Sequence, residues 1–331
     1  MNSFGRIFRV SIWGESHGPA VGVIVDGCPP GIPLDPEDFR RDLDRRRSGA
    51  PGTTGRRESD APVFKSGIHE GRTTGSPLGI EFENADTDSS SYRKIRDIPR
   101  PGHADWTALA KFKGFSDLRG GGHFSGRLTV DLVAAGVIAK KIIEPASVSA
   151  AICEVGGVRD YEESLRQAAL SGDSLGAIVE CRAENVPPGV GEPFFDSVES
   201  LVAHAVFSIP GVKGIEFGDG FRAARMKGSE FNDAIIDRKG VTRTNHSGGI
   251  NGGLSNGNEI VFRVAVRPTA SIALPQRTVD LARNRIATLK LGGRHDVCIA
   301  LRMPVILEAA TAIVLADLLL AAGRGAAGAG I

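Results

Sequence analysis

Apolar residues gather in two short runs near the N-terminus, at residues 6–13 and 20–26, and the turn GESHG lies between them. We expect the two runs to pair as a β-hairpin. The segment CPPGIPL then leads into a predicted helix over residues 36–47, with Asp35 as its N-cap. Residues 126–143 have helical length and a mostly apolar surface, which predicts a helix at the centre of the fold.

From residue 148 onward, segments of strand and helix character follow one another. Such a mixture predicts an α+β fold. The predicted strands are 148–155, 175–183 and 259–266, and the predicted helices are 161–170, 196–207, 277–289 and 304–320.

No linker-like segment divides the chain, so we expect one domain over residues 1–322 and a low-complexity, disordered tail at 323–331. The phrases PPGIP and PPGVG hint at two related halves, but their surroundings are spaced differently. Two long polar stretches, 48–62 and 84–105, are predicted loops, and loops of that length are usually functional or disordered.

Composition narrows the class of protein. Of the 331 residues 41% are hydrophobic and the formal net charge is +1, which excludes a disordered chain and argues against a nucleic-acid binder. The start of the chain lacks the pattern of a secretory signal, and Glu308 and Asp317 interrupt the longest apolar run. The four cysteines form no CxxC pair, so no metal site is expected. We expect a cytoplasmic protein that does not span a membrane.

Two histidines lie in glycine-containing loops, His17 in GESHGPA and His103 in RPGHADW. A turn between glycines is a poor place for core packing, and an imidazole can exchange a proton near neutral pH. We therefore expect His17 to contact a ligand. Asp105 either orients His103 or only caps the turn, and the local sequence leaves both readings open.

Glycine-rich loops and clustered arginines favour an anionic ligand. The segment DLRGGGHFSGRLT, at 117–129, places backbone N–H groups at a predicted helix N-terminus, although a turn used only for packing is the alternative. The loop at 242–258 offers many donors, and GGRHD precedes the last helix. Seven arginines fall within 40–57; some belong to a solvated helix face, whereas those at 45–47 could bind carboxylate or phosphate. The residues alone predict an enzyme for a small, multiply anionic substrate, with two histidines and a phosphate-bearing cofactor.

Together these motifs resemble the chorismate synthase family. The matching segments follow in order along nearly the whole chain: FRVSIWGESHG, VDGCPPGIPL, DLDRRRSG, GRRESD, SGIHEGRTTGSPLG, RPGHADW, RGGGHFSGRLT, HSGGINGG, RPTAS and GGRHD. The resemblance implies a carbon–oxygen lyase that converts 5-enolpyruvylshikimate 3-phosphate to chorismate and phosphate by anti-1,4-elimination, in the biosynthesis of aromatic amino acids. It also implies a β-α-β sandwich with helices packed between sheets, assembled as a homotetramer.

The same resemblance implies reduced FMN as the cofactor, although the reaction has no net redox change. Some members of the family reduce their own flavin with NADPH, and others need it supplied. With no appended segment in these 331 residues, we expect the second type, with NADPH as an indirect reductant and a separate flavin reductase as a partner.

Roles for individual residues follow from the resemblance. His17 matches a histidine proposed to protonate the leaving phosphate or the substrate, and His103 matches one proposed to protonate the reduced flavin. Asp296 matches an aspartate proposed to assist proton removal at the flavin, and Arg46 an arginine assigned to NADP contact. The implied substrate ligands are Arg45, Arg47, Arg100 and Arg127, and the implied flavin contacts are His123, Phe124, Ser125, His246, Ser247, Gly252, Arg267, Pro268, Thr269, Ala270, Ser271 and Arg294.

The chain departs from the family pattern at six of these positions. NHSGG stands for the usual NNAGG at residues 245–249, and RPTAS for KPTSS at 267–271. HFSGRLT stands where most members have RSSARET, so His123 replaces an arginine and Phe124 a serine. Because the charge of His123 depends on pH, we expect His123→Arg to tighten FMN binding. The alternative is a catalytically altered relative that still binds FMN or a phosphate ligand, and the presence of both His17 and His103 argues against it. A purely structural protein does not explain so many polar glycine-rich loops.

Overall fold

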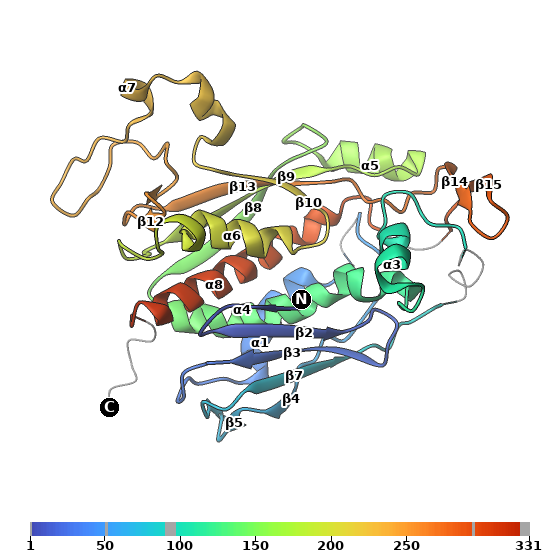
Figure 1. Ribbon diagram of the computed structural model, residues 1–331, viewed down its shortest axis with the longest axis horizontal. Coiled ribbons are helices and arrows are strands. Elements are labelled where there is room, and N and C mark those ends of the chain that lie inside the picture. Colours follow the sequence, from blue (N-terminus) through green and yellow to red (C-terminus); the bar gives the residue numbers. More distant parts are fainter. Residues whose placement is uncertain (1, 50–51, 90–96, 293–294, 325–331) are drawn as a thin grey trace.

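Two antiparallel sheets enclose a layer of helices in the computed structural model (Figure 1), which confirms the α+β sandwich. The structure describes residues 2–49, 52–89, 97–292 and 295–324, so positions 325–331 of the expected tail lie outside the described residues.

The first sheet has five strands in the order β1-β2-β3-β7-β4. The strands are β1 (Ser3–Phe4), β2 (Arg9–Gly14), β3 (Ala20–Asp26), β4 (Val63–Ser66) and β7 (Leu78–Glu83), and a small hairpin of β5 (Ile68–His69) and β6 (Arg72–Thr73) lies between β4 and β7 in sequence. Strands β2 and β3 pair antiparallel, with Trp13 opposite Gly22, so the predicted N-terminal hairpin is confirmed. The turn of this hairpin carries His17.

The second sheet has four strands in the order β10-β13-β9-β8. These are β8 (Ser147–Val155), β9 (Ala177–Glu184), β10 (Val212–Phe217) and β13 (Ile260–Val266), with α5 (Glu162–Ser171) and α6 (Val198–Phe207) in the connections. Along β13 every second residue is fully buried, because one face of this sheet packs on the helices. The strands predicted at 148–155, 175–183 and 259–266 and the helices predicted at 161–170 and 196–207 are confirmed.

The helical layer contains α1 (Pro36–Arg46), α4 (Thr129–Ile143) and α8 (Met303–Ala321). Helix α1 begins with the predicted cap, since Asp35 accepts from a backbone N–H and forms a capping box. Helices α4 and α8 cross closely at Gly136, where an added Cβ would lie 2.3 Å from the Cβ of Ala309. The segment Ile299–Ala321 is long and apolar enough to cross a membrane, but 89% of its most apolar stretch of 18 residues is buried inside this fold.

The two acidic residues that interrupt this apolar helix have specific partners. Asp317 accepts hydrogen bonds from three consecutive backbone N–H groups, those of Arg6, Ile7 and Phe8, and so fixes the start of the first sheet to α8. Glu308 pairs with Arg45 of α1 and Lys140 of α4. Each carboxylate therefore joins elements that are far apart in sequence.

The helix predicted at 277–289 is wrong. These residues form a hairpin of β14 (Gln276–Asp280) and β15 (Arg285–Leu289), with Asn284 in a left-handed conformation in the turn. The β-branched side chains in both arms favour strands, and Ile286 remains 62% exposed, so no core stabilises a helix here.

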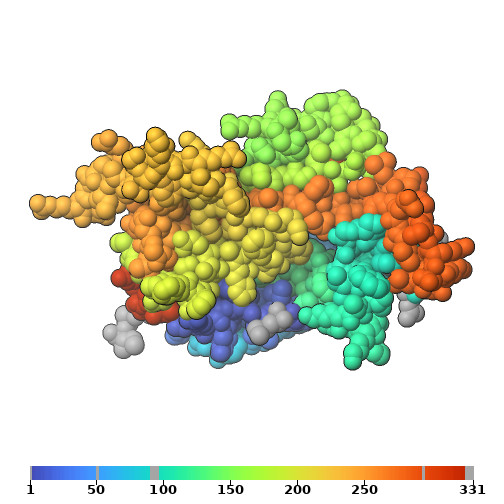
Figure 2. All heavy atoms as spheres, turned by 45° about the horizontal axis from the view of Figure 1, so that its top comes forward, coloured from blue at the N-terminus to red at the C-terminus, as the bar shows by residue number. Residues whose placement is uncertain are grey.

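Three further features flank the sandwich. Helix α3 (Asp105–Phe112) and the glycine-rich turn η1 (Arg119–Phe124) lead into α4 through η2 (Gly126–Leu128). At the opposite end, residues 218–249, which we call the arm, contain η4 (Gly220–Arg225) and α7 (Gly228–Phe231) and extend away from the second sheet (Figures 1 and 2). The hairpin β11 (Ile250–Asn251) and β12 (Leu254–Ser255) follows the arm.

Candidate active site

A cavity of about 660 Å³ lies at the N-terminal ends of the two central helices, and the first residues of α4 and α8, Thr129 and Met303, line it. A second cavity of about 510 Å³ adjoins it and shares part of its wall, including Arg100, His103 and Arg267. The positive ends of two helices favour negative charge in the larger cavity. The predicted loops 48–62 and 84–105 both contribute to its wall.

The side chains around the larger cavity carry an excess of positive charge. Among the described residues, eight arginines and five carboxylates line it. The arginines are Arg46, Arg47, Arg56, Arg57, Arg100, Arg127, Arg267 and Arg302. This balance suits a small ligand with several negative charges, as the sequence predicts.

His17 lies in the turn after β2, against the glycine-rich turn η1. A Cβ on Gly120 would lie 2.4 Å from Nε2 of His17, and Gly120 has a positive φ of 61°, so this contact requires glycine. Nδ1 of His17 is hydrogen-bonded to the hydroxyl of Ser89 at 2.8 Å. Burial, and then the guanidinium of Arg56, lowers the pKa of His17, so the ring is neutral at pH 7.

His103 enters the cavity from the loop before α3, and its Nε2 lies 2.8 Å from the hydroxyl of Ser271. Burial, and then the charge of Arg100, lowers its pKa to about 4. Asp105 caps the turn, because its Oδ2 accepts the backbone N–H of Arg100 at 2.9 Å, and its charge raises the pKa of His103 against the larger effect of burial. The two carboxylate oxygens of Asp105 also bind the Nε and Nη2 of Arg100, each at 2.7 Å, and so fix that arginine.

Asp60 holds two arginines of the cavity wall. Its carboxylate is completely buried and pairs with Arg46 from the end of α1 and with Arg127 from the turn before α4. Burial alone would raise the pKa of Asp60, but the two guanidiniums outweigh it and lower the pKa. One buried carboxylate thus leaves this part of the wall with a net positive charge.

Asp296 connects the start of the last helix with the loop after α1. One of its oxygens accepts from the backbone N–H of Thr54 at 2.9 Å, and the other accepts from Arg302 at 2.6 Å. Both oxygens therefore already have a donor within this chain.

Most of the expected site residues meet at the larger cavity, although they come from six separate segments. Those that line it are His17, Arg46, Arg47, Arg100, His103, Phe124, Ser125, Arg127, Arg267, Thr269, Ala270, Ser271 and Asp296. Pro268 lies within the same segment but does not line this cavity, and Arg294 lies outside the described residues.

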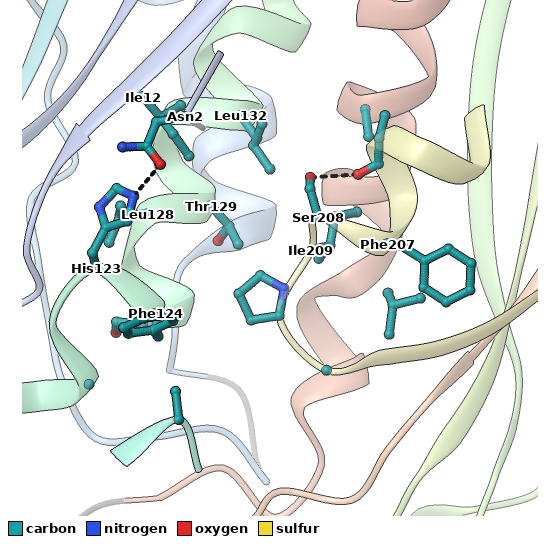
Figure 3. A pocket seen from close by; sticks show the side chains of 18 of the residues that line it. Asn2, Ile12, His123, Phe124, Leu128, Thr129, Leu132, Phe207, Ser208 and Ile209 are labelled. Atoms are coloured by element: carbon teal, nitrogen blue, oxygen red, sulfur yellow. Dashed lines mark hydrogen bonds between the residues drawn. The ribbon is translucent and has the colours of Figure 1, made fainter. Parts of the chain in front are cut away.

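Two expected ligands are directed elsewhere. Arg45 forms a two-pronged ion pair with Glu308 and does not line the cavity. His123 lines the smaller cavity, where its Nδ1 lies 2.9 Å from the carbonyl of Gly14 and its Nε2 lies 3.1 Å from Oδ1 of Asn2 (Figure 3). Both side chains are engaged within the chain, and the effect of His123→Arg on FMN binding stays a prediction.

His246 and Ser247 belong to the arm, and Gly252 lies in the turn between β11 and β12. The arm and β12 lie at the opposite end of the molecule from α3 (Figure 1). The backbone N–H groups of His246 and Ser247 donate to Asp233, and Nδ1 of His246 lies 2.8 Å from Asp219. These residues support the base of the arm and line neither cavity of this chain.

Sequence patterns do not single out Ser16, Asp60 or Arg302, all of which line the cavity. Ser16 is fully buried, and Arg56 binds both its hydroxyl and its carbonyl. For Asp60 the available signal is an acidic residue after paired arginines in GRRESD. No sequence motif marks Arg302 as a site residue. Its place at the site depends on its hydrogen bond to Asp296, which only the structure reveals.

Several buried polar atoms of the wall lack a hydrogen-bond partner within the described part of the chain. They are Nε of Arg46, Nε of Arg47, Oγ1 of Thr269, Nε2 of His295 and Nε of Arg302. Buried polar atoms are rarely left unpaired in a folded protein. Their concentration at one cavity therefore indicates a site that a polar ligand completes.

Comparison with known proteins identifies this arrangement. A family model described as chorismate synthase matches residues 8–320. The chorismate synthase of Chitinophaga pinensis is 60% identical over 97% of each chain, and that of Korarchaeum cryptofilum is 48% identical over 98% of each chain. A crystal structure of chorismate synthase superposes with a TM-score of 0.73 at 27% identity, covering 96% of this chain and 93% of that chain. The chain therefore belongs to the chorismate synthase family.

Proposed function

We propose that this chain converts 5-enolpyruvylshikimate 3-phosphate to chorismate and phosphate by anti-1,4-elimination, with reduced FMN bound at the same site. The observation that carries the proposal is a single cavity that gathers His17, His103 and eight arginines. The substrate has a phosphate and two carboxylates, which matches that excess of guanidinium groups.

The arginines bind and orient the substrate. Arg46 and Arg127 are held by Asp60, and Arg100 is held by Asp105, so their positions are set before a ligand arrives. Preorganised charges lower the barrier most when they face the group on which charge develops. In this reaction that group is the phosphate, which leaves with the electron pair of its C–O bond.

The histidines are placed to take part in proton transfer. His17 is neutral in the ligand-free protein, and a phosphate dianion bound beside it favours its protonated form. Substrate binding thus supplies His17 with a proton that it can donate to the departing phosphate. The elimination also releases a proton from C6 of the ring as the new double bonds form, so a proton acceptor must lie on the other side of the reacting carbons.

The residues present fit a flavin phosphate and ring system. Arg267 and Ser271 lie on one segment of the cavity wall, and Phe124 and Ser125 lie on another; the unpaired Oγ1 of Thr269 adds a polar group between Arg267 and Ser271. When bound, the reduced flavin supplies electron density that helps to expel the phosphate. Burial, and then the charge of Arg100, keeps the His103 imidazole neutral, and its hydrogen bond to Ser271 holds it at this wall.

We also propose that four copies assemble and that the protein is cytoplasmic. The arm exposes large apolar side chains, with Phe221 83%, Ile235 71% and Ile236 57% exposed, as expected of a surface that another copy covers. His246 and Ser247 belong to this arm and line neither cavity of their own chain. The first sheet packs on α4, the second packs mainly on α8, and these two helices pack on each other, which supports one folded domain over residues 1–322. Light scattering after size-exclusion chromatography tests the assembly, and a monomeric mass would contradict it.

The catalytic roles are tested with the variants His17→Ala and His103→Ala. Each is incubated without oxygen with photoreduced FMN and substrate, and chorismate absorbance and phosphate release are followed. We expect each change to lower kcat about 10²- to 10⁴-fold, the usual range for a lost proton-transfer group. His69→Ala is the matched control, because His69 is exposed in the β5–β6 hairpin. Full activity in either site variant would contradict its assigned role.

The supply of reduced flavin is tested in the same assay. We propose that NADPH acts only through a separate flavin reductase. NADPH added as the sole reductant should then give no turnover until such a reductase is added. If NADPH alone supports turnover, the chain reduces its own flavin and no reductase partner is required.

A further inference from the structure

His295 lies in the loop that precedes the last helix and lines the larger cavity. The charge of Arg100 acts on its ring, and its own charge acts on His103. His295 is therefore close to the cationic wall that binds the substrate in the proposed function. None of the roles implied by the family resemblance falls on it.

The two nitrogens of the His295 ring differ in their surroundings. Nε2 is shielded from solvent and has no hydrogen-bond partner within the described residues, whereas the ring is hydrogen-bonded to the backbone of Gly292. That bond must therefore use Nδ1. Since it raises the pKa of the ring, the ring is the donor and the carbonyl of Gly292 the acceptor.

This pairing defines the free nitrogen chemically. Burial, and then the charge of Arg100, keeps the pKa of His295 below its ordinary value despite the bond to Gly292. The ring is neutral at pH 7, with its proton on Nδ1 and a lone pair on Nε2. The cavity wall thus contains a hydrogen-bond acceptor among many donors.

The neighbouring carboxylate does not compete for this function. Both oxygens of Asp296 already accept hydrogen bonds, one from Thr54 and one from Arg302. Within the described part of the loop, Nε2 of His295 is the buried acceptor that remains unpaired.

We propose that Nε2 of His295 accepts a hydrogen bond from an N–H or O–H group of a bound ligand. The inference rests on the proposed function, in which two ligands carry such a donor: the ring hydroxyl of the substrate and the ring N–H of the flavin. A buried acceptor without a donor is unfavourable, so a ligand that supplies one gains affinity from it.

Two amide variants separate the acceptor from the loop contact. His295→Asn keeps a donor for Gly292 but is too short to place an acceptor at the position of Nε2. His295→Gln places its amide oxygen near that position. A role in ligand binding predicts that the Gln variant binds better than the Asn variant, whereas a role only in holding the loop predicts the reverse order.

The experiment measures the Kd for oxidised FMN by fluorescence, and the KM and kcat for the substrate with saturating reduced FMN. The loss of one neutral hydrogen bond corresponds to about a three- to tenfold change. We expect His295→Asn to raise either the FMN Kd or the substrate KM by this factor, and His295→Gln to change it less than about twofold. A change in Kd assigns the donor to the flavin, and a change in KM assigns it to the substrate. His69→Asn, at the exposed His69, is the control.

Wild-type affinity for both ligands in His295→Asn would overturn the inference, and so would equal or tighter binding by Asn than by Gln. The wild-type protein in the same experiment tests the proposed function separately. If it binds FMN and releases phosphate, a negative result in the variants removes only the role of His295. If it releases no phosphate, the proposed function itself fails.

Discussion

Replacing Asp60 with asparagine tests how the arginine wall is held in place. Asp60→Asn keeps the shape of the side chain and one acceptor oxygen but removes the negative charge between Arg46 and Arg127. Both guanidiniums would then remain close together without a counter-ion. We expect the variant to fold with greatly reduced stability and to bind the substrate less well, because its arginines are no longer fixed.

The magnitude follows from burial. The side chain of Asp60 is 0% exposed, and those of Arg46 and Arg127 are 5% and 3% exposed. Removing one member of a buried ion pair costs about 3–5 kcal/mol, because the remaining charge stays buried without compensation. A domain has a total free energy of unfolding of about 5–15 kcal/mol, so this is a large fraction of it.

Denaturant unfolding at pH 7 measures the effect, with Asp44→Asn as the control. Asp44 pairs with Arg47 on the exposed face of α1, and such surface pairs contribute less than about 1 kcal/mol. Because the pKa of Asp60 is lowered, its contribution to the free energy of unfolding is fully present above about pH 4 and is lost as the pH falls further. The stabilities of the wild type and the variant should therefore converge in acid. A loss below about 1 kcal/mol at pH 7, no larger than in Asp44→Asn, would show that Asp60 does not hold the two arginines in place.

Three further predictions concern stability, each measured by denaturant unfolding. His103 has a pKa of about 4, so as the pH falls from 6.5 to 4 its imidazole becomes protonated in the unfolded chain but stays neutral in the folded chain. The free energy of unfolding of the wild type should therefore fall by about 3 kcal/mol relative to that of His103→Gln over this range. Parallel pH curves for the two proteins would contradict this. Replacing a glycine by alanine inside a helix usually raises the free energy of unfolding by up to about 1 kcal/mol. In Gly136→Ala the contact at 2.3 Å with Ala309 should instead lower it by about 1–3 kcal/mol. Gly228→Ala is the control and should leave stability unchanged, because the added Cβ meets open space. Asp317→Asn weakens an acceptor of three N–H groups and should cost about 1–3 kcal/mol; an unchanged midpoint would exclude that anchor.

The pattern of apolar and polar residues is sufficient to predict the type of those helices and strands that pack in the core. The apolar runs of β2 and β3 and the apolar helix α4 are long, and their predicted type is confirmed. The helix predicted at 277–289 is wrong because β14 and β15 are short and lie mostly outside the core. The spacing of apolar residues in such strands is not set by burial, so it does not indicate the type of element.

The direction of charged side chains could not be predicted from their position in the sequence. Arg45, Arg46 and Arg47 are consecutive, but a helix turns by about 100° per residue and directs them to different surroundings. Arg45 reaches Glu308, which is 263 residues away, whereas Arg46 reaches the buried Asp60. Such long-range pairs leave no local pattern in the sequence.

The residues that sequence motifs did place at one cavity are mostly those in glycine-rich loops. His17 and Gly120 show why. A tight turn and a close contact with an imidazole side chain both require glycine, and the glycines can be read directly from the sequence. The arm differs, since its motif HSGG lies far from the cavity of the same chain.

In the proposed function, this cavity expels phosphate from an allylic ester without net oxidation or reduction. The most direct measurement is phosphate release by the wild-type protein under strict exclusion of oxygen, with photoreduced FMN and 5-enolpyruvylshikimate 3-phosphate, while flavin and chorismate absorbance are recorded together. We expect one chorismate for each phosphate over many turnovers, with the flavin still reduced at the end. Protein that binds reduced FMN and substrate but releases no phosphate would contradict it.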